Sequence, residues 1–239
     1  MKTWIGPVGI LVLCLAALVL VAAVIGTRPS RPSPAPSSRP LDVEAVRARA
    51  ELGDARAQWQ LGEAYARWEG VAPNYAEAAK WYRRAAEQGD ADAQAALGEL
   101  CQAGQGVPKN LAEAGSWFQL AARQGNARAQ YSLAFMYETG RGFPQDQAEA
   151  ARWYRLAAEQ GMPLAQYDLG QRYDLGVGLP VDRVEALKWL SLAAAQGQTD
   201  ALDRRDKVRR KMTREEIVEA KKRIARFSPS QPPAPSKSD

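Results

Sequence analysis

The side chains that could do chemistry in this 239-residue chain are mainly carboxylates, because the sequence contains no histidine. Histidine is the side chain most often used as a general base and as a transition-metal ligand, so a Ser-His-Asp triad and a histidine-ligated zinc site are excluded. Of the two cysteines, Cys14 lies inside an apolar N-terminal run, which leaves Cys101 without an intrachain partner. A disulfide framework and a four-thiolate zinc site are therefore excluded as well.

The acidic residues do not form a recognisable catalytic pattern. Asp168 and Asp174 fall on a segment that is expected to be helical, beside no other reactive side chain. No two carboxylates stand out as a general acid and a general base. The glycines lie at expected helix ends rather than in a phosphate-binding loop. We therefore expect a protein that is not an enzyme, uses no metal or cofactor and has no small-molecule substrate.

The net charge of +5 is unevenly distributed along the chain. Residues 1–40 carry +4, residues 41–202 carry −5, residues 203–226 carry +6 and the remaining tail is neutral. A general nucleic-acid binder usually carries its basic face on the folded body, which is mildly acidic here. The charge distribution therefore argues against nucleic acid as the main partner.

The elements that must position these side chains repeat every 36 residues, which is typical of a stacked solenoid. Alanine, leucine and then tyrosine or cysteine recur at four-residue spacing, as on the apolar face of a helix. The expected helix starts are capped by Asp54, Asp90 and Asn126. The predicted units are 53–88, 89–124, 125–160 and 161–196, with an N-terminal capping helix at 41–52 and C-terminal capping helices at 197–227.

A second helix is expected in the latter part of every unit. It begins at an Asn or Asp with a glutamate three residues later, which predicts a reciprocal capping box. The pairs are Asn74 with Glu77, Asn110 with Glu113, Asp146 with Glu149, and Asp182 with Glu185. A tryptophan follows each glutamate by four residues, and we expect these tryptophans to fill the core between neighbouring hairpins. They are Trp81, Trp117, Trp153 and Trp189.

The N-terminal region predicts membrane association. After a short head (1–4), residues 5–26 carry no charge, and 22 residues of helix can cross a hydrocarbon core of about 30 Å. We expect an uncleaved transmembrane or signal-anchor helix in the inner (cytoplasmic) membrane, crossing once, with the repeats exported to the periplasm. Secretion after signal cleavage and an orientation with cytoplasmic repeats are the alternatives.

Two Pro-rich segments flank the folded body. Residues 27–40 contain five prolines among 14 residues and are expected to form an extended linker. Residues 228–239 are also rich in proline and serine and are expected to be a disordered tail.

The repeated residues resemble the Sel-one-like repeat (SLR) family, a relative of the tetratricopeptide repeat. The third unit carries the pattern as Ala129, Leu133, Tyr137, Gly140-Arg-Gly142, Asp146, Trp153-Tyr154, Ala157-Ala158 and Gly161. The departures are local: Trp68 replaces a glycine, Cys101 a tyrosine, Ala134 a glycine and Leu190 a tyrosine. The resemblance implies an all-α, right-handed α-solenoid of helix-turn-helix repeats and an adaptor role in protein complexes of the bacterial cell envelope.

A protein-interaction scaffold is therefore the first functional hypothesis, with a protein or peptide partner on the concave face that first helices usually line. Candidate partner-binding residues are Trp59, Glu63, Trp68, Tyr131, Phe135, Tyr167 and Gln171. Trp59, Tyr131 and Tyr167 share one repeat position, so an alternative interpretation is that they only pack between units. Phe135 and Trp68 break the repeat and are better candidates for binding.

The second hypothesis places an anionic lipid or nucleic-acid site on the basic C-terminal helix, residues 204–226. Each Lys or Arg near an anionic surface contributes roughly 1 kcal/mol to binding. The competing interpretation is that these side chains form the solvated outer face of a terminal cap.

Overall fold

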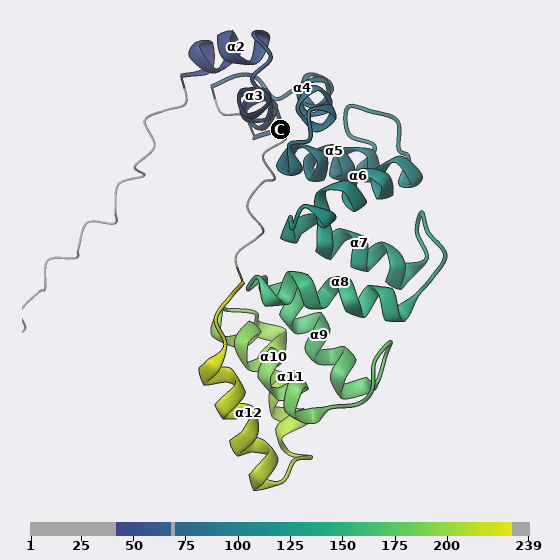
Figure 1. Ribbon diagram of the computed structural model, residues 1–239, viewed down its shortest axis with the longest axis vertical. Coiled ribbons are helices and arrows are strands. Elements are labelled where there is room, and N and C mark those ends of the chain that lie inside the picture. Colours follow the sequence, from purple (N-terminus) through teal and green to yellow (C-terminus); the bar gives the residue numbers. More distant parts are fainter. Residues whose placement is uncertain (1–41, 68–69, 231–239) are drawn as a thin grey trace, which may run out of the picture. The chain divides into compact units, whose positions relative to one another are not determined.

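The computed structural model describes residues 42–67 and 70–230, which lie within one compact unit, Leu41–Asp239. This part of the chain contains eleven helices and no strand, so the all-α prediction is confirmed (Figure 1). The helices are α2 (Val43–Glu51), α3 (Ala55–Arg67), α4 (Tyr75–Glu87), α5 (Ala91–Ala103), α6 (Leu111–Arg123), α7 (Ala127–Thr139), α8 (Gln147–Glu159), α9 (Pro163–Leu175), α10 (Arg183–Ala195), α11 (Thr199–Arg209) and α12 (Arg214–Arg226).

The helices form a solenoid of four helical hairpins. The first helices of the hairpins are α3, α5, α7 and α9, and the second helices are α4, α6, α8 and α10. From α2 to α11, each helix packs against its neighbours along the chain, so every hairpin shares a contact surface with the next one (Figure 1). Helix α2 covers α3 at one end, and both α11 and α12 pack on α10 at the other.

The core between the helices is built mainly from small side chains and one large residue per hairpin. The paired alanines of the second helices are almost all buried, which lets the helix axes approach closely. The large residue is the one directly after each tryptophan: Tyr82, Phe118, Tyr154 and Leu190. The prediction that the tryptophans themselves form the core is correct only for Trp189, which is 3% exposed. The other three are half-buried, with one side against the core.

Glycines on the first helices make room for these large residues. A Cβ atom added to Gly98 would lie 2.7 Å from a ring carbon of Phe118, and Gly62 faces the ring of Tyr82 in the same way. Such distances are far below van der Waals contact. The glycine is therefore required by the close approach of the two helices of a hairpin.

The predicted N-caps of the first helices are confirmed: Asp54, Asp90 and Asn126 accept from the backbone N–H three residues later. The prediction of capping boxes at the second helices is only half correct. Oδ1 of Asn74 accepts from the N–H of Glu77 at 3.1 Å, but the N–H of Asn74 donates to the carbonyl of Tyr65 at 3.0 Å. Because that donor already has a partner, the glutamate need not cap it, and its carboxylate pairs with basic side chains instead.

The same pattern recurs in the other three repeats. The N–H groups of Asn110, Asp146 and Asp182 donate to carbonyls of the preceding first helix at 2.9 to 3.0 Å. Among the described helices, a complete capping box is found at Thr213 and Glu216, where α12 begins.

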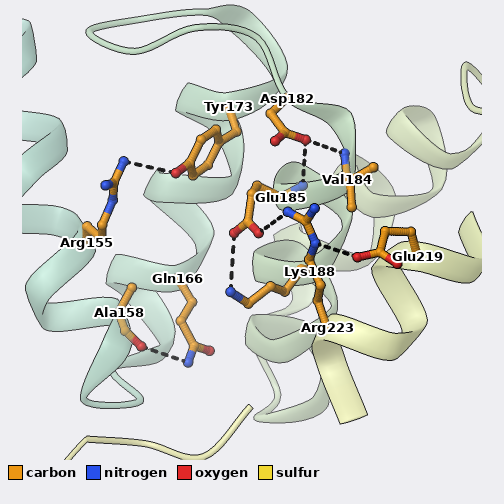
Figure 2. Close-up of polar contacts among 10 residues, drawn as sticks. All are labelled: Arg155, Ala158, Gln166, Tyr173, Asp182, Val184, Glu185, Lys188, Glu219 and Arg223. Carbon is orange, nitrogen blue, oxygen red and sulfur yellow. Dashed lines mark hydrogen bonds and ion pairs between the residues drawn. The ribbon is translucent and has the colours of Figure 1, made fainter. Parts of the chain in front are cut away.

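A ladder of buried glutamines, which was not predicted from the sequence, connects the hairpins. Gln94 donates from Nε2 to the carbonyl of Ala86 at 3.1 Å, and its Oε1 accepts from Gln124 at 2.8 Å. The glutamines at the equivalent position of the other three repeats make both contacts in the same way. Figure 2 shows the Gln166 amide donating to the carbonyl of Ala158. The ladder consists of Gln58, Gln94, Gln130 and Gln166. Each glutamine thus supplies a second hydrogen bond to a helix-end carbonyl that also accepts from a backbone N–H, as Ala86 does from Gly89 at 3.0 Å.

Several predictions concern residues outside the described part of the chain: the head 1–4, the anchor helix 5–26, the linker 27–40, Trp68 and the tail after Ser230. No helix within residues 42–67 and 70–230 is long and apolar enough to cross a membrane. The described start of the predicted tail lies against the repeats, because the N–H of Ser230 donates to the carbonyl of Glu159 at 2.8 Å.

Candidate protein-interaction site

Three of the predicted binding residues pack between hairpins. Trp59 on α3 is half-buried against the core, and the guanidinium of Arg56 lies 3.8 Å from its ring centroid. Tyr131 on α7 meets Tyr154 edge-to-face with ring centroids 5.4 Å apart, and Tyr167 on α9 packs against the last core cluster. The structure therefore favours the packing interpretation for this repeat position.

Glu63 lies in a polar depression on the first helices. It accepts a hydrogen bond from the Tyr82 hydroxyl at 2.7 Å and pairs with Arg67 at 2.7 Å. A cavity of about 140 Å³ adjoins it, and Glu99 of α5 and Arg128 of α7 also line this cavity. Glu99 occupies the same repeat position as Glu63, and burial raises the pKa of its carboxyl group, while Arg128 lowers it in part.

A similar arrangement recurs two hairpins later. The Tyr154 hydroxyl donates to Glu138 at 2.6 Å, and Arg172, whose side chain is only 4% exposed, pairs with the same carboxylate at 2.6 Å. Burial also raises the pKa of Asp168 to about 6, assisted by the charge of Glu138 and opposed by Tyr131 and Arg172. Glu99 and Glu138 were not among the predicted site residues. For Glu138 the signal was Tyr154, whose hydroxyl needs an acceptor when its ring is buried.

Phe135 and Gln171 lie at the same repeat position as Glu63 and Glu99, on α7 and α9. Both side chains are half-buried, and the guanidinium of Arg141 lies 6.0 Å from the Phe135 ring centroid. The positions Glu63, Glu99, Phe135 and Gln171 define what we call the first-helix face. It presents two acids, an aromatic ring and an amide at one register of four stacked helices, a composition suited to a polypeptide ligand.

The sequence model of the family described as Sel1 repeat matches four consecutive segments, residues 55–90, 91–126, 127–162 and 163–198. Each segment contains one hairpin. The chain belongs to the Sel1 repeat family. The matched segments begin two residues after the units counted from Gly53.

Two solved structures of Sel1-type proteins resemble the chain. One, a protective antigen present in uropathogenic Escherichia coli strains and displaying an SLR fold, is 35% identical with a TM-score of 0.71. The match covers 77% of this chain, which spans only 40% of that protein. A Sel1 repeat protein from Oxalobacter formigenes is 32% identical with a TM-score of 0.64, and the match covers 80% and 78% of the two chains. A search of curated protein sequences gives no match.

Membership of the Sel1 repeat family indicates a protein–protein interaction role in general terms. No group of three or more His, Cys, Asp or Glu side chains within the described ranges could hold a metal ion. Cys101 is buried in the second Sel1 repeat, and burial together with the nearby charge of Glu113 raises the pKa of its thiol. A raised pKa makes a thiol less nucleophilic at neutral pH.

The basic segment after the fourth Sel1 repeat is partly neutralised by ion pairs. Arg204 and Lys211 lie 3.2 Å and 3.6 Å from Asp174, whose side chain is 5% exposed. Of the eleven basic side chains in residues 203–226, five take part in ion pairs: Arg204, Arg205, Lys207, Lys211 and Arg223. Arg204, Lys211 and Arg223 pair with acids of the fourth repeat, whereas Arg205 and Lys207 pair with aspartates of α11 itself.

Proposed function

We propose that this Sel1 repeat chain is a membrane-tethered scaffold that binds a protein or peptide partner on its first-helix face, the concave face of the expected solenoid. The observation that carries the proposal is the composition of that face. Glu63 is partly buried and Glu99 is exposed beside it, and a partner that supplies N–H or guanidinium donors gains charge-assisted hydrogen bonds to these carboxylates. Phe135, in the same register, offers an aromatic ring of the kind enriched at binding hot spots.

The partner-binding proposal is tested by site-specific photo-crosslinking in cells that express the full-length chain. A benzophenone side chain is placed at Phe135 or Gln171, and at Lys80 as a control. Lys80 lies on the second helix α4 with its side chain 68% exposed. A discrete crosslinked protein should form from the first two positions and not from Lys80. Identical products from all three positions, or none from any, would contradict the proposal.

The identified partner is then titrated against purified variants. Phe135→Ala should weaken its binding by about tenfold or more, the size expected for a hot spot. Leu120→Ala is the matched control, because Leu120 is an exposed apolar residue of α6 outside the first-helix face. Equal effects of the two substitutions would argue against this face as the binding surface.

Tethering and export belong to the same proposal, and residues 5–26 and 27–40 support them by composition. Fusions of alkaline phosphatase and of a fluorescent protein to the C-terminus report the side of the membrane. Phosphatase activity without fluorescence is expected for exported repeats, and the reverse result would place the repeats in the cytoplasm. Retention of the full-length mass in the membrane fraction would distinguish an anchor from a cleaved signal.

A further inference from the structure

A groove of about 610 Å³ lies between the second helices α6 and α8. Gln119 and Arg123 of α6 line one side of it, and Glu149 and Trp153 of α8 line the other. Tyr137 of α7 and residues 144–146 also line this α6–α8 groove, but none of the four residues that define the first-helix face does. Its lining has the mixed aromatic and charged character of surfaces that bind polypeptide.

The chain itself occupies the corresponding positions one repeat later. There the second helices are α8 and α10, and α12 packs on α10. Arg223 of α12 donates to Glu185 at 2.6 Å, as Figure 2 shows, and the Phe227 ring meets Trp189 edge-to-face with centroids 5.4 Å apart. Ser230 then donates to the carbonyl of Glu159. Glu185 and Trp189 are the repeat equivalents of Glu149 and Trp153. Residues 223–230 therefore show how a polypeptide segment can bind to this pair of positions.

Burial differs between the occupied and the open groove. Trp189 is 3% exposed beneath Phe227, whereas Trp153 is only half-buried. The side chain of Glu185 is 17% exposed, and that of Glu149 is 36% exposed. The α6–α8 groove thus presents the same two groups, Glu149 and Trp153, and no equivalent of α12 covers them within residues 42–67 and 70–230.

The pairing of the groove glutamates points to a guanidinium as the missing partner. Glu113 receives Arg83 from the preceding second helix, and Glu185 receives Arg223 from α12. Glu149 is paired with Arg152, three residues later on its own helix, whose side chain is 69% exposed. The position of Arg83 is taken by Gln119 in this repeat, which has no charge to offer.

The two grooves differ in the sign of one charged residue, and this difference predicts which ligand sequence the α6–α8 groove prefers. Glu159 at the end of α8 lines the space beside Arg226 and Phe227. Its equivalent at the end of α6 is Arg123. A basic residue directly before the phenylalanine, as in the chain's own segment, would therefore face a like charge in the α6–α8 groove, whereas an acidic residue would face an opposite one.

We propose that the α6–α8 groove binds a segment of a partner protein that carries an arginine and, four residues later, a phenylalanine preceded by an acidic residue. The arginine pairs with Glu149, the phenylalanine covers Trp153, and the acidic residue faces Arg123. The interaction is independent of the first-helix face, so failure of one proposal leaves the other standing.

The test uses two fluorescent peptides titrated against the full chain. One has the sequence of residues 213–230 and the other carries Arg226→Glu. We expect the Arg226→Glu peptide to bind about tenfold more tightly, since the substitution replaces a like-charge contact with an opposite one. On the protein, Trp153→Ala and Glu149→Arg should each weaken that binding by about tenfold.

Matched controls separate loss of the groove from loss of the fold. Trp81→Ala and Glu77→Arg change the same repeat positions in the first hairpin and should leave binding unchanged. Circular dichroism melts verify that every variant folds. A peptide that carries both Arg226→Glu and Arg223→Glu should regain affinity for the Glu149→Arg protein, because the ion pair is restored with its charges exchanged.

Three outcomes would overturn the proposal. The first is that neither peptide binds, and the second is that binding is insensitive to both Trp153→Ala and Glu149→Arg. The third is that the peptide of native sequence binds more tightly than the Arg226→Glu peptide. The last outcome would identify the terminal segment of a second copy of this chain as the preferred occupant.

Discussion

Arg83 on α4 donates to the carboxylate of Glu113 on α6 at 2.8 Å, and this ion pair joins two consecutive hairpins. At the equivalent position of α2, α6 and α8, the side chain donates to a tyrosine hydroxyl of the following first helix. These contacts are Arg47 to Tyr65, Gln119 to Tyr137 and Arg155 to Tyr173. The second repeat has Cys101 in place of that tyrosine, so Arg83 turns to the glutamate instead.

The Arg83–Glu113 pair should contribute little to stability, because its side chains are 41% and 34% exposed to solvent. A double-mutant cycle with Arg83→Ala and Glu113→Ala should give a coupling free energy of about 0.5 kcal/mol, which decreases with salt. Arg83 lowers the pKa of Glu113, so the coupling should be lost as the pH falls below the usual range of a glutamate. Urea unfolding of the four proteins measures it, and a coupling that salt and acid leave unchanged would contradict an ion pair.

The glutamine ladder should be important for stability. Gln94→Ala removes two hydrogen bonds, the one to the carbonyl of Ala86 and the one from the amide of Gln124. A hydrogen bond of this kind contributes about 1 kcal/mol, so we expect a loss of about 2 kcal/mol in the free energy of unfolding. Gln105→Ala, at an exposed position, is the control and should change it by less than about 0.5 kcal/mol. Similar losses for the two variants would refute a structural role for the ladder.

Asp168 should make the protein more stable in mild acid. Its pKa is raised to about 6, mainly by burial, above the ordinary value of 3.8. The folded state therefore binds the proton more tightly, and this contribution is fully present below pH about 4 and is lost as the pH rises through about 6. Relative to the wild type, Asp168→Asn should be more stable by on the order of 1 kcal/mol at pH 7 and similar at pH 4. A difference between the two proteins that does not change with pH would show that the carboxyl group is not perturbed.

Gly98→Ala should destabilise the protein although alanine is the better helix former. The added Cβ would lie 2.7 Å from the Phe118 ring, and overpacking of a core typically costs about 1–3 kcal/mol. The helical preference of alanine offsets about 0.5–1 kcal/mol of this. In a Phe118→Ala background, which removes the ring carbons that the added Cβ would meet, the same substitution should cost less. An equal cost in both backgrounds would mean that the ring is not the obstacle.

Much of the fold could be predicted from local patterns in the sequence. The paired alanines, the first-helix caps such as Asp54 and the positive-φ glycines each act within a few residues, and each was found where expected. The roles of Glu77 and its equivalents were predicted wrongly, because the cap N–H donates to a carbonyl of another helix. The ladder around Gln94 was overlooked, although a glutamine recurs at the same position in all four repeats.

The sequence by itself determined a row of helical hairpins, because periodicity, capping and glycine conformation depend on neighbours along the chain. Only the tertiary structure decided which tryptophan is covered and which glutamate receives an arginine from elsewhere. Trp153 and Trp189 occupy the same repeat position, yet only Trp189 lies beneath Phe227, 38 residues further along. The physical reason is that such contacts depend on which distant helix packs alongside, and the repeat pattern does not specify that helix.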